Sequence, residues 1–115
     1  MTVEVWFNPR CGTARNVRDW LDEHDVDFEL REYLKDPPTK AEIESVLQKA
    51  DIKASELLRS KEALAEELRL RGSDDEDAIL AAMAEHPILI NRPVVIDGDR
   101  AKLCRPADEV AEMFA

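Results

Sequence analysis

The chain has 115 residues, of which 44% are hydrophobic and 37% are charged, and its formal net charge is −10. This size predicts one globular domain, and the excess of acidic residues argues against nucleic acid or an anionic membrane as a partner. No apolar run approaches the ~20 residues of a membrane-spanning helix, and the first residues lack the basic and apolar blocks of a signal peptide.

The first thirty residues show three periodic segments. Apolar side chains alternate with polar ones over residues 3–7 and again over residues 26–31, as in β-strands. Between them, apolar residues recur at helical spacing over about residues 13–24. Strand, helix and strand in this order predict a βαβ unit with parallel strands.

The middle of the chain is predicted to be helical. Two segments, beginning at Thr39 and at Ser73, have the S/T-x-x-E form of a capping box. The first opens a helix with an apolar face, and the second opens a helix that ends near Pro87. Spaced leucines between them predict at least one more helix: Leu57, Leu58, Leu64 and Leu68.

The last segment returns to strands. Residues 94–96 and 101–104 flank Asp97-Gly98-Asp99, which predicts a β-hairpin, and Pro106 suits the first turn of a final helix. The order is βαβ, helical block, ββα. We find no repeat or linker, so we expect a single domain over 1–115 with a helical insertion at about residues 38–86.

The segment N-P-R-C-G-T-A-R-N at residues 8–16 places Cys11 just ahead of a helix. Free backbone N–H groups and the helix dipole stabilise a thiolate there, which makes the cysteine reactive. Gly12 lets the backbone come close to the group that Cys11 attacks. The alternative is an inert buried thiol, but the flanking Arg10 and Arg15 favour a reactive one.

At this point the chain resembles the ArsC-type arsenate reductases. The matching motifs follow one another in order along nearly the whole chain: N-P-x-C-G-T-x-R-N at 8–16, Y-L-x-x-P-P at 33–38, L-L-R at 57–59, H-P-I-L-I-N-R-P at 86–93 and L-C-R-P at 103–106. The resemblance implies an α/β thioredoxin/glutaredoxin-like fold, with a mixed sheet flanked by helices and a helical insertion.

The resemblance also implies the site. The cysteine matching Cys11 attacks arsenate, and the arginines matching Arg59, Arg92 and Arg105 bind the oxyanion, as planar guanidinium groups do well. Supporting residues come from the same motifs: Asn8, Gly12, Thr13, Arg15 and Pro93. Pro93 corresponds to the cis-proline beside the cysteine of thioredoxin-like folds, so the Arg92–Pro93 bond is expected to be cis.

The resemblance further implies that no cofactor is bound and that glutathione or another small thiol donates electrons, with a glutaredoxin-like reductase as partner. The position where a resolving cysteine would stand holds Ala14, and Cys104 is the only other thiol. Two distant cysteines predict no disulfide framework, and a reducing cytoplasm is the expected location. With two histidines and no cysteine pair, no metal site is expected. We expect His24 to be structural, on the apolar face of the first helix, and His86 to stop a helix.

The match has one departure, and two other readings of the motif stay open. Some family members carry a histidine where this chain has Phe7, so a helper role for that residue does not carry over, and Arg10 is the candidate replacement cation. The first alternative is a glutathione-dependent thiol/disulfide reductase on the same fold. The second is a regulator resembling the Spx proteins, which bind RNA polymerase and sense oxidation through Cys-x-x-Cys. Ala14 argues against that regulator, because it replaces the second cysteine.

Overall fold

The computed structural model describes residues 2–114, and the chain divides into two units. The sheet unit consists of Met1–Asp36 and Arg92–Ala115, and the helical unit is Pro37–Asn91. The helical unit includes the segment predicted as an insertion, and the expectation that the chain is one domain stays a prediction.

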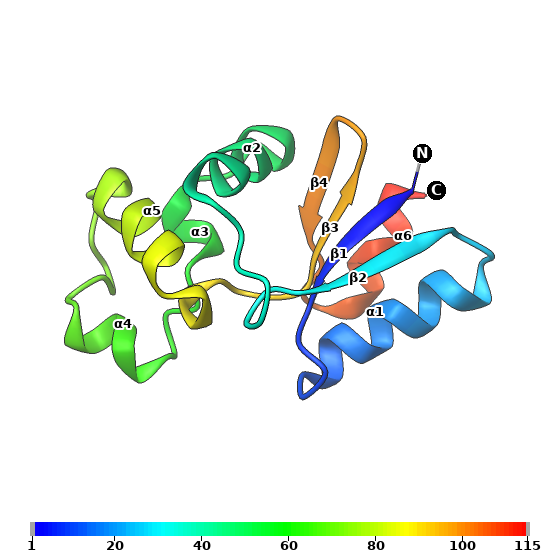
Figure 1. Ribbon diagram of the computed structural model, residues 1–115, viewed down its shortest axis with the longest axis horizontal. Helices are drawn as coiled ribbons and strands as arrows, with labels where there is room; N and C mark the ends of the chain where they lie inside the picture. Colours follow the sequence, from blue (N-terminus) through cyan, green and yellow to red (C-terminus); the bar gives the residue numbers. More distant parts are fainter. Residues whose placement is uncertain (1, 115) are drawn as a thin grey trace. The chain divides into compact units, whose positions relative to one another are not determined.

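The sheet unit has four strands in the order β2-β1-β3-β4 (Figure 1). Their bounds are Val3–Phe7 for β1, Phe28–Glu32 for β2, Val94–Asp97 for β3 and Arg100–Leu103 for β4. β1 runs parallel to β2, whereas β3 is antiparallel to both β1 and β4. Two helices complete the unit, α1 (Gly12–Glu23) and α6 (Val110–Met113). The predicted thioredoxin/glutaredoxin-like fold, a βαβ unit followed later by ββα, is confirmed.

One face of β1 forms the core of the sheet unit. Val3, Val5 and Phe7 share that face because strand side chains alternate, and all three are buried. The same buried cluster contains residues of α1, of α6 and both cysteines, namely Ala14, Val17, Leu21, Val110, Met113, Cys11 and Cys104. The helical period of α1 therefore fixes its N-terminal end, with Cys11, against the end of β1.

α1 ends in a Schellman motif, which explains why β2 begins later than the sequence predicted. Asp25 is left-handed (φ 56°) and its N–H donates to Asp22 O at 3.2 Å, while Val26 N–H donates to Leu21 O at 3.0 Å. Val26 is thus part of the helix stop and not of β2. His24, expected to be structural on the apolar face of the first helix, is the C-cap of α1: it is exposed and stacks on Trp20, with ring centroids 3.8 Å apart.

The helical unit contains four helices within Pro37–Asn91: α2 (Lys40–Ala50), α3 (Ala54–Leu57), α4 (Ala63–Glu67) and α5 (Glu76–Glu85). The capping box at Thr39 is confirmed, since its hydroxyl accepts from Glu42 N–H and the Glu42 carboxylate accepts from Thr39 N–H. His86 is the C-cap of α5, as predicted, and Pro87 begins a short 3₁₀ turn.

The second capping box, predicted at Ser73, is wrong. The N-cap of α5 is Asp75, whose carboxylate accepts from Ala78 N–H at 3.1 Å. Ser73 instead accepts from Asp75 N–H, and Glu76 Oε1 accepts from the Ser55 hydroxyl at 2.7 Å. Asp is a strong N-cap residue, so α5 begins two residues later than the S-x-x-E pattern indicated.

The predicted hairpin is confirmed with shifted ends. Asp97 pairs with Arg100, so the turn consists of Gly98 and Asp99, and Gly98 takes the positive φ (62°) that this turn requires. β4 stops at Leu103, and Cys104 N–H donates to Pro93 O at 2.9 Å just beyond the strand. Pro106 caps a 3₁₀ turn, Ala107–Glu109, that precedes α6.

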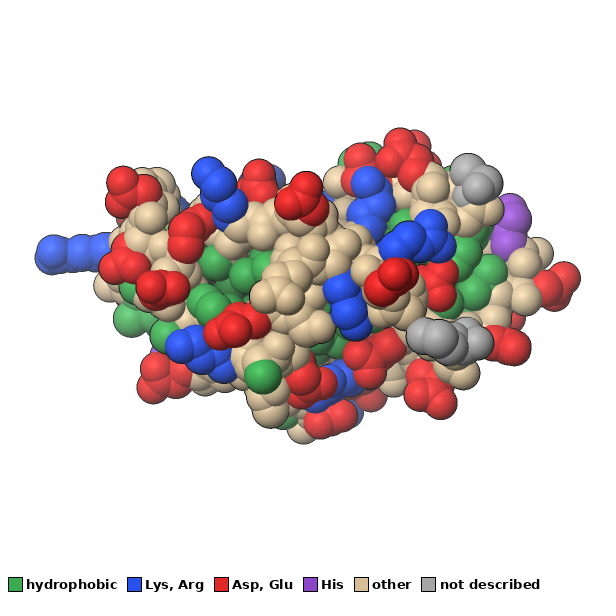
Figure 2. Space-filling model, turned by 90° about the horizontal axis from the view of Figure 1, so that it is seen from above, with side chains coloured by type: hydrophobic (Ala, Val, Ile, Leu, Met, Phe, Trp, Pro, Cys, Tyr) green, Lys and Arg blue, Asp and Glu red, His purple; other side chains and the backbone are tan. Residues whose placement is uncertain are grey.

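Within residues 2–114, no helix is long and apolar enough to cross a membrane. On the face shown in Figure 2, acidic side chains are widely spread, with lysine and arginine side chains between them.

Candidate active site

Cys11 lies at the N-cap of α1, in a loop that its own backbone and Asn8 hold in place. Cys11 N–H donates to Asn8 O, and the Asn8 carboxamide oxygen accepts from Arg10 N–H, both at 3.0 Å. Cys11 O then accepts the first helical hydrogen bond from Arg15 N–H. Asn8 thus supports the loop that carries the cysteine, and the predicted position of Cys11 between strand and helix is confirmed.

The sulfur of Cys11 is largely buried but lies among hydrogen-bond donors. Arg92 and Arg105 are both side-chain donors to it, and Arg105 Nη1 lies 3.6 Å from Sγ. Burial raises the pKa of the Cys11 thiol. The backbone N–H of Ala14 and the guanidinium groups of Arg92 and Arg105 outweigh this effect, so the pKa falls below its ordinary value. A larger fraction of Cys11 is therefore thiolate at neutral pH.

Arg92 and Arg105 come together because they flank the paired strands β3 and β4. Val94 pairs with Leu103, so the residues just outside that pair lie side by side. Arg105 Nη1 donates to Arg92 O at 3.0 Å, and Arg92 is buried. The Arg92–Pro93 bond is cis, as predicted, and the Arg105–Pro106 bond is also cis, which the sequence reading did not predict.

Arg59, the third predicted oxyanion-binding arginine, belongs to the helical unit. Its backbone N–H donates to Leu89 O at 2.7 Å, and its Nη1 pairs with Glu62 at 3.1 Å. The structure therefore brings two of the three predicted arginines to Cys11, and a role for Arg59 stays a prediction.

Two further predicted residues, Gly12 and Thr13, occupy the first turn of α1. Gly12 has no positive φ, and a Cβ on it would meet only Arg15 Nη2, at 3.8 Å. The backbone conformation therefore does not require glycine at position 12. What glycine provides here is open space next to Arg15.

Phe7, which replaces the family histidine, is buried, and the Arg18 guanidinium carbon lies 5.6 Å from the centre of its ring. This cation–π contact stabilises the Phe7 ring at the position where some family members carry the ionisable histidine. Arg92 and Arg105 are the side chains that lower the Cys11 pKa, so the sequence hypothesis that Arg10 supplies this charge is not supported.

Two groups beside the site were not predicted from the sequence: the Ala14 N–H, which lowers the pKa of Cys11, and Arg18, which lies over the Phe7 ring. The Ala14 N–H is a backbone group that no side-chain motif reveals, and Arg18 was not singled out, although it lies seven residues after Cys11 on the same helical stripe.

Cys104 differs from Cys11 in its pKa, although both cysteines are buried. It is fully buried, and burial raises its pKa to about 12, against the opposing charge of Lys102. Its thiol donates to Lys102 O at 3.8 Å, and both cysteines are free thiols. Cys104 therefore stays protonated. Over the described part of the chain, no group of three or more His, Cys, Asp or Glu side chains is placed to hold a metal.

Comparison with known proteins gives one family. The model of the ArsC family matches residues 6–113. An arsenate reductase of Rhizobium meliloti (strain 1021) is 39% identical, over 99% of this chain and 82% of that protein. The arsenate reductase of Escherichia coli (strain K12) is 34% identical, over 97% and 80%. The structure of an arsenate reductase from Vibrio cholerae matches with a TM-score of 0.91 and 34% identity, covering 97% of each chain.

Proposed function

The chain belongs to the ArsC family, and we propose that it is an arsenate reductase in which Cys11 is the nucleophile and a small external thiol supplies the electrons. The observation that carries this proposal is the contact of Arg105 with the Cys11 sulfur, beside the buried Arg92. A thiolate next to two guanidinium groups suits a reaction in which sulfur attacks the centre of an oxyanion.

In the first step, the Cys11 thiolate attacks the arsenic of arsenate. An S–As bond forms, one arsenate oxygen leaves as water after taking up protons, and arsenic stays pentavalent. Arg92 and Arg105 neutralise the oxyanion, which would otherwise repel the thiolate. We propose that Arg59 is the third cation of this site, as its L-L-R motif implies.

In the second step, an external thiolate attacks Cys11 Sγ. The new S–S bond is a mixed disulfide, and the electron pair of the S–As bond leaves with arsenic, which becomes trivalent and departs as arsenite. A second thiol then reduces the mixed disulfide. Cys104 is buried with a raised pKa, so we assign this second thiol to a glutaredoxin-like partner and propose glutathione as the first, in a cytoplasmic setting.

The test is arsenite production by the purified protein supplied with arsenate, glutathione and a glutaredoxin. We expect turnover by the wild type and none by Cys11→Ser, with a glutathione adduct on Cys11 visible by mass spectrometry. Arg100→Ala, which alters an exposed arginine at the start of β4, is the matched control for a change on the surface. Reduction of glutathione-mixed disulfides without any arsenite would contradict the proposal and favour the disulfide reductase alternative.

A further inference from the structure

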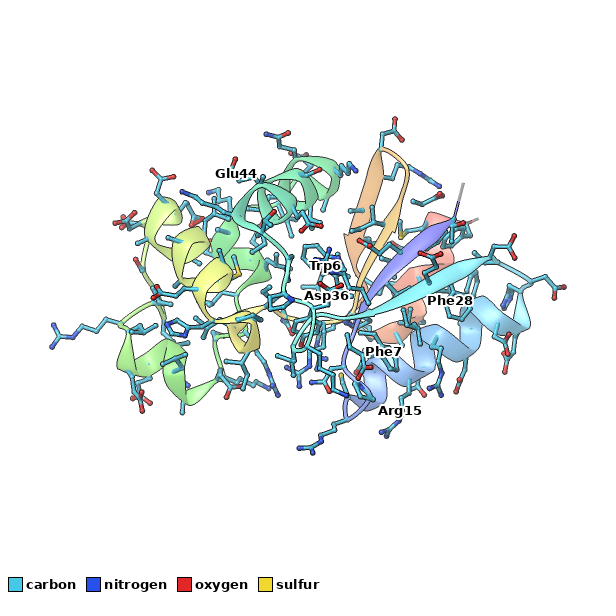
Figure 3. The ribbon with its side chains drawn as sticks, in the orientation of Figure 1. Trp6, Phe7, Arg15, Phe28, Asp36 and Glu44 are labelled. Carbon is cyan, nitrogen blue, oxygen red and sulfur yellow. The ribbon has the colours of Figure 1, made fainter. Side chains whose placement is uncertain are left out.

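The guanidinium of Arg15 is held over the loop that carries Cys11. Arg15 lies one helical turn after Cys11, and its side chain turns back toward the N-terminus of α1, where Nη1 donates to Pro9 O at 3.0 Å. Nη2 lies 3.8 Å from the position that a Cβ on Gly12 would take. Figure 3 shows Arg15 at this end of α1, close to the loop that follows Phe7. A backbone carbonyl thus fixes the charge beside the residue next to the nucleophile.

Among the residues that the structure describes, this guanidinium has no carboxylate partner, although the sequence has 26 acidic residues. Five other arginines each pair with a carboxylate at 3.4 Å or less: Arg18, Arg31, Arg59, Arg71 and Arg100. Within residues 2–114, no Asp or Glu forms an ion pair with Arg15, which is exposed. Since Pro9 O accepts one of its five N–H donors, the others remain available to an anion.

The position of Arg15 sets a minimum length for a ligand that binds it and also reacts at Cys11. Arg92 and Arg105 are the arginines at Sγ, whereas Arg15 donates to Pro9 O and its Nη2 lies 3.8 Å from the Cβ position of residue 12. A tetrahedral oxyanion at the sulfur is already met by Arg92 and Arg105. A ligand that reacts at Sγ and also reaches Arg15 must extend past Gly12, where a Cβ would meet no side-chain atom within 4 Å except Arg15 Nη2, the neighbours Cys11 and Thr13 left aside.

We propose that Arg15 binds a carboxylate of the thiol that exchanges with Cys11, so that the electron donor is a small thiol bearing carboxylates several bonds from its sulfur. This inference rests on the proposed function, in which an external thiol attacks Cys11. It assigns to Arg15 the recognition of the donor, separate from the binding of arsenate.

The test compares two disulfides that react with Cys11 in the same way. The Cys11 thiolate attacks oxidised glutathione, an S–S bond forms between Sγ and one glutathione sulfur, and the electron pair of the broken bond leaves with the other as thiolate. Bis(2-hydroxyethyl) disulfide undergoes the same exchange but carries no charge. The ratio of the two rate constants, measured by mass spectrometry, isolates recognition, because any change in thiolate reactivity alters both rates.

We expect Arg15→Ala to lower this ratio about fivefold, the effect of losing one exposed ion pair. Arg15→Lys should keep most of the preference, and Arg15→Glu should lower it further by repulsion. Arg100→Ala, a control on another exposed arginine, should keep the wild-type ratio. Raising the ionic strength from about 0.02 M to about 0.5 M should bring the wild-type ratio close to that of Arg15→Ala.

Two outcomes would overturn the inference and they are distinguishable. If both disulfides react with Cys11 but Arg15→Ala keeps the wild-type ratio at low salt, Arg15 does not bind the donor, while thiol exchange at Cys11 stands. If the wild type reacts with neither disulfide, thiol exchange itself is wrong, and the role of Arg15 with it.

Discussion

Arg105 reaches Cys11 across 94 positions of sequence, with its Nη1 3.6 Å from the cysteine Sγ. The same nitrogen donates to Arg92 O at 3.0 Å, which ties the two arginines to one another. The guanidinium of Arg105 is therefore held between the nucleophile and the Arg92 backbone.

Arg105→Ala is expected to raise the pKa of Cys11, because the thiolate loses a charged hydrogen-bond donor. Rates of iodoacetamide alkylation followed across pH measure this shift directly, with Arg100→Ala as the control. Arsenite production should fall about a hundredfold, as for the loss of one oxyanion-binding donor. An unchanged alkylation profile would show that Arg105 does not stabilise the thiolate.

Arg59→Ala is expected to raise the KM for arsenate at least tenfold while leaving the alkylation profile of Cys11 unchanged, since Arg59 is not among the groups that lower its pKa. Arg69→Ala is the matched control in the same helical unit, and Arg69 is exposed. Arg71 is less suitable, because it donates to Ser60 O beside Arg59. Equal KM values for Arg59→Ala and Arg69→Ala would remove Arg59 from the site.

Gly12→Ala is expected to fold with an unchanged or slightly higher Tm, because the added Cβ makes only an ordinary contact with Arg15 Nη2 and alanine suits a helix better than glycine. Exchange of Cys11 with oxidised glutathione should nevertheless slow, since the methyl group fills space next to Arg15 Nη2, where the donor is proposed to bind. Thermal unfolding and mixed-disulfide formation are the two measurements. A large loss of Tm would mean that the backbone needs glycine for its own sake.

Cys104 is expected to make the protein less stable as the pH rises. Its folded pKa is about 12, above the value of about 8.5 for a free thiol, so above pH 8.5 the unfolded chain binds fewer protons than the native state. The free energy of unfolding then falls with pH, by at most about 1.4 kcal/mol per unit from this group. Urea unfolding at several pH values should show a smaller alkaline loss for Cys104→Ala than for the wild type.

The same variant tests whether Cys104 resolves the Cys11 adduct. With glutathione as reductant, Cys104→Ala should turn over arsenate at close to the wild-type rate, because a buried protonated thiol is a poor nucleophile. An inactive variant, together with a Cys11–Cys104 disulfide in the oxidised wild type, would contradict the monothiol mechanism.

Local patterns in the sequence predicted local structure well. The alternation in β1, the Thr39 capping box and the place of Cys11 before α1 all depend on neighbours within a few residues. The errors arose where two local signals competed. At α5, Asp75 is a nearer N-cap than Ser73, and after α1 the helix stop includes Val26.

The candidate site depended on contacts that local patterns do not contain. Arg92 and Arg105 were identified by family motifs, and their places at the two edges of the predicted hairpin indicated that folding could bring them together, but not that they would meet at Cys11. The Ala14 N–H and the contact of Arg18 with Phe7 were not predicted, since the first has no side-chain signature and the second depends on how α1 packs on β1.

The two-residue turn of the hairpin has a consequence for insertions and deletions. Because Asp97 pairs with Arg100, every later partner along β3 and β4 is set by backbone pairing, up to Val94 with Leu103. One extra residue within β4 would shift its pairing with β3 by one position. Either the side chains between the insertion and the turn would then point to the opposite face of the sheet, or Arg105 would move away from Arg92. Such a change would alter the charge around the sulfur without replacing any residue of the site. Insertions or deletions within the paired residues of β3 and β4 are therefore expected to be as damaging as substitution of Arg105. Extra residues should be tolerated only in the turn, at Gly98 and Asp99, beyond the last pair.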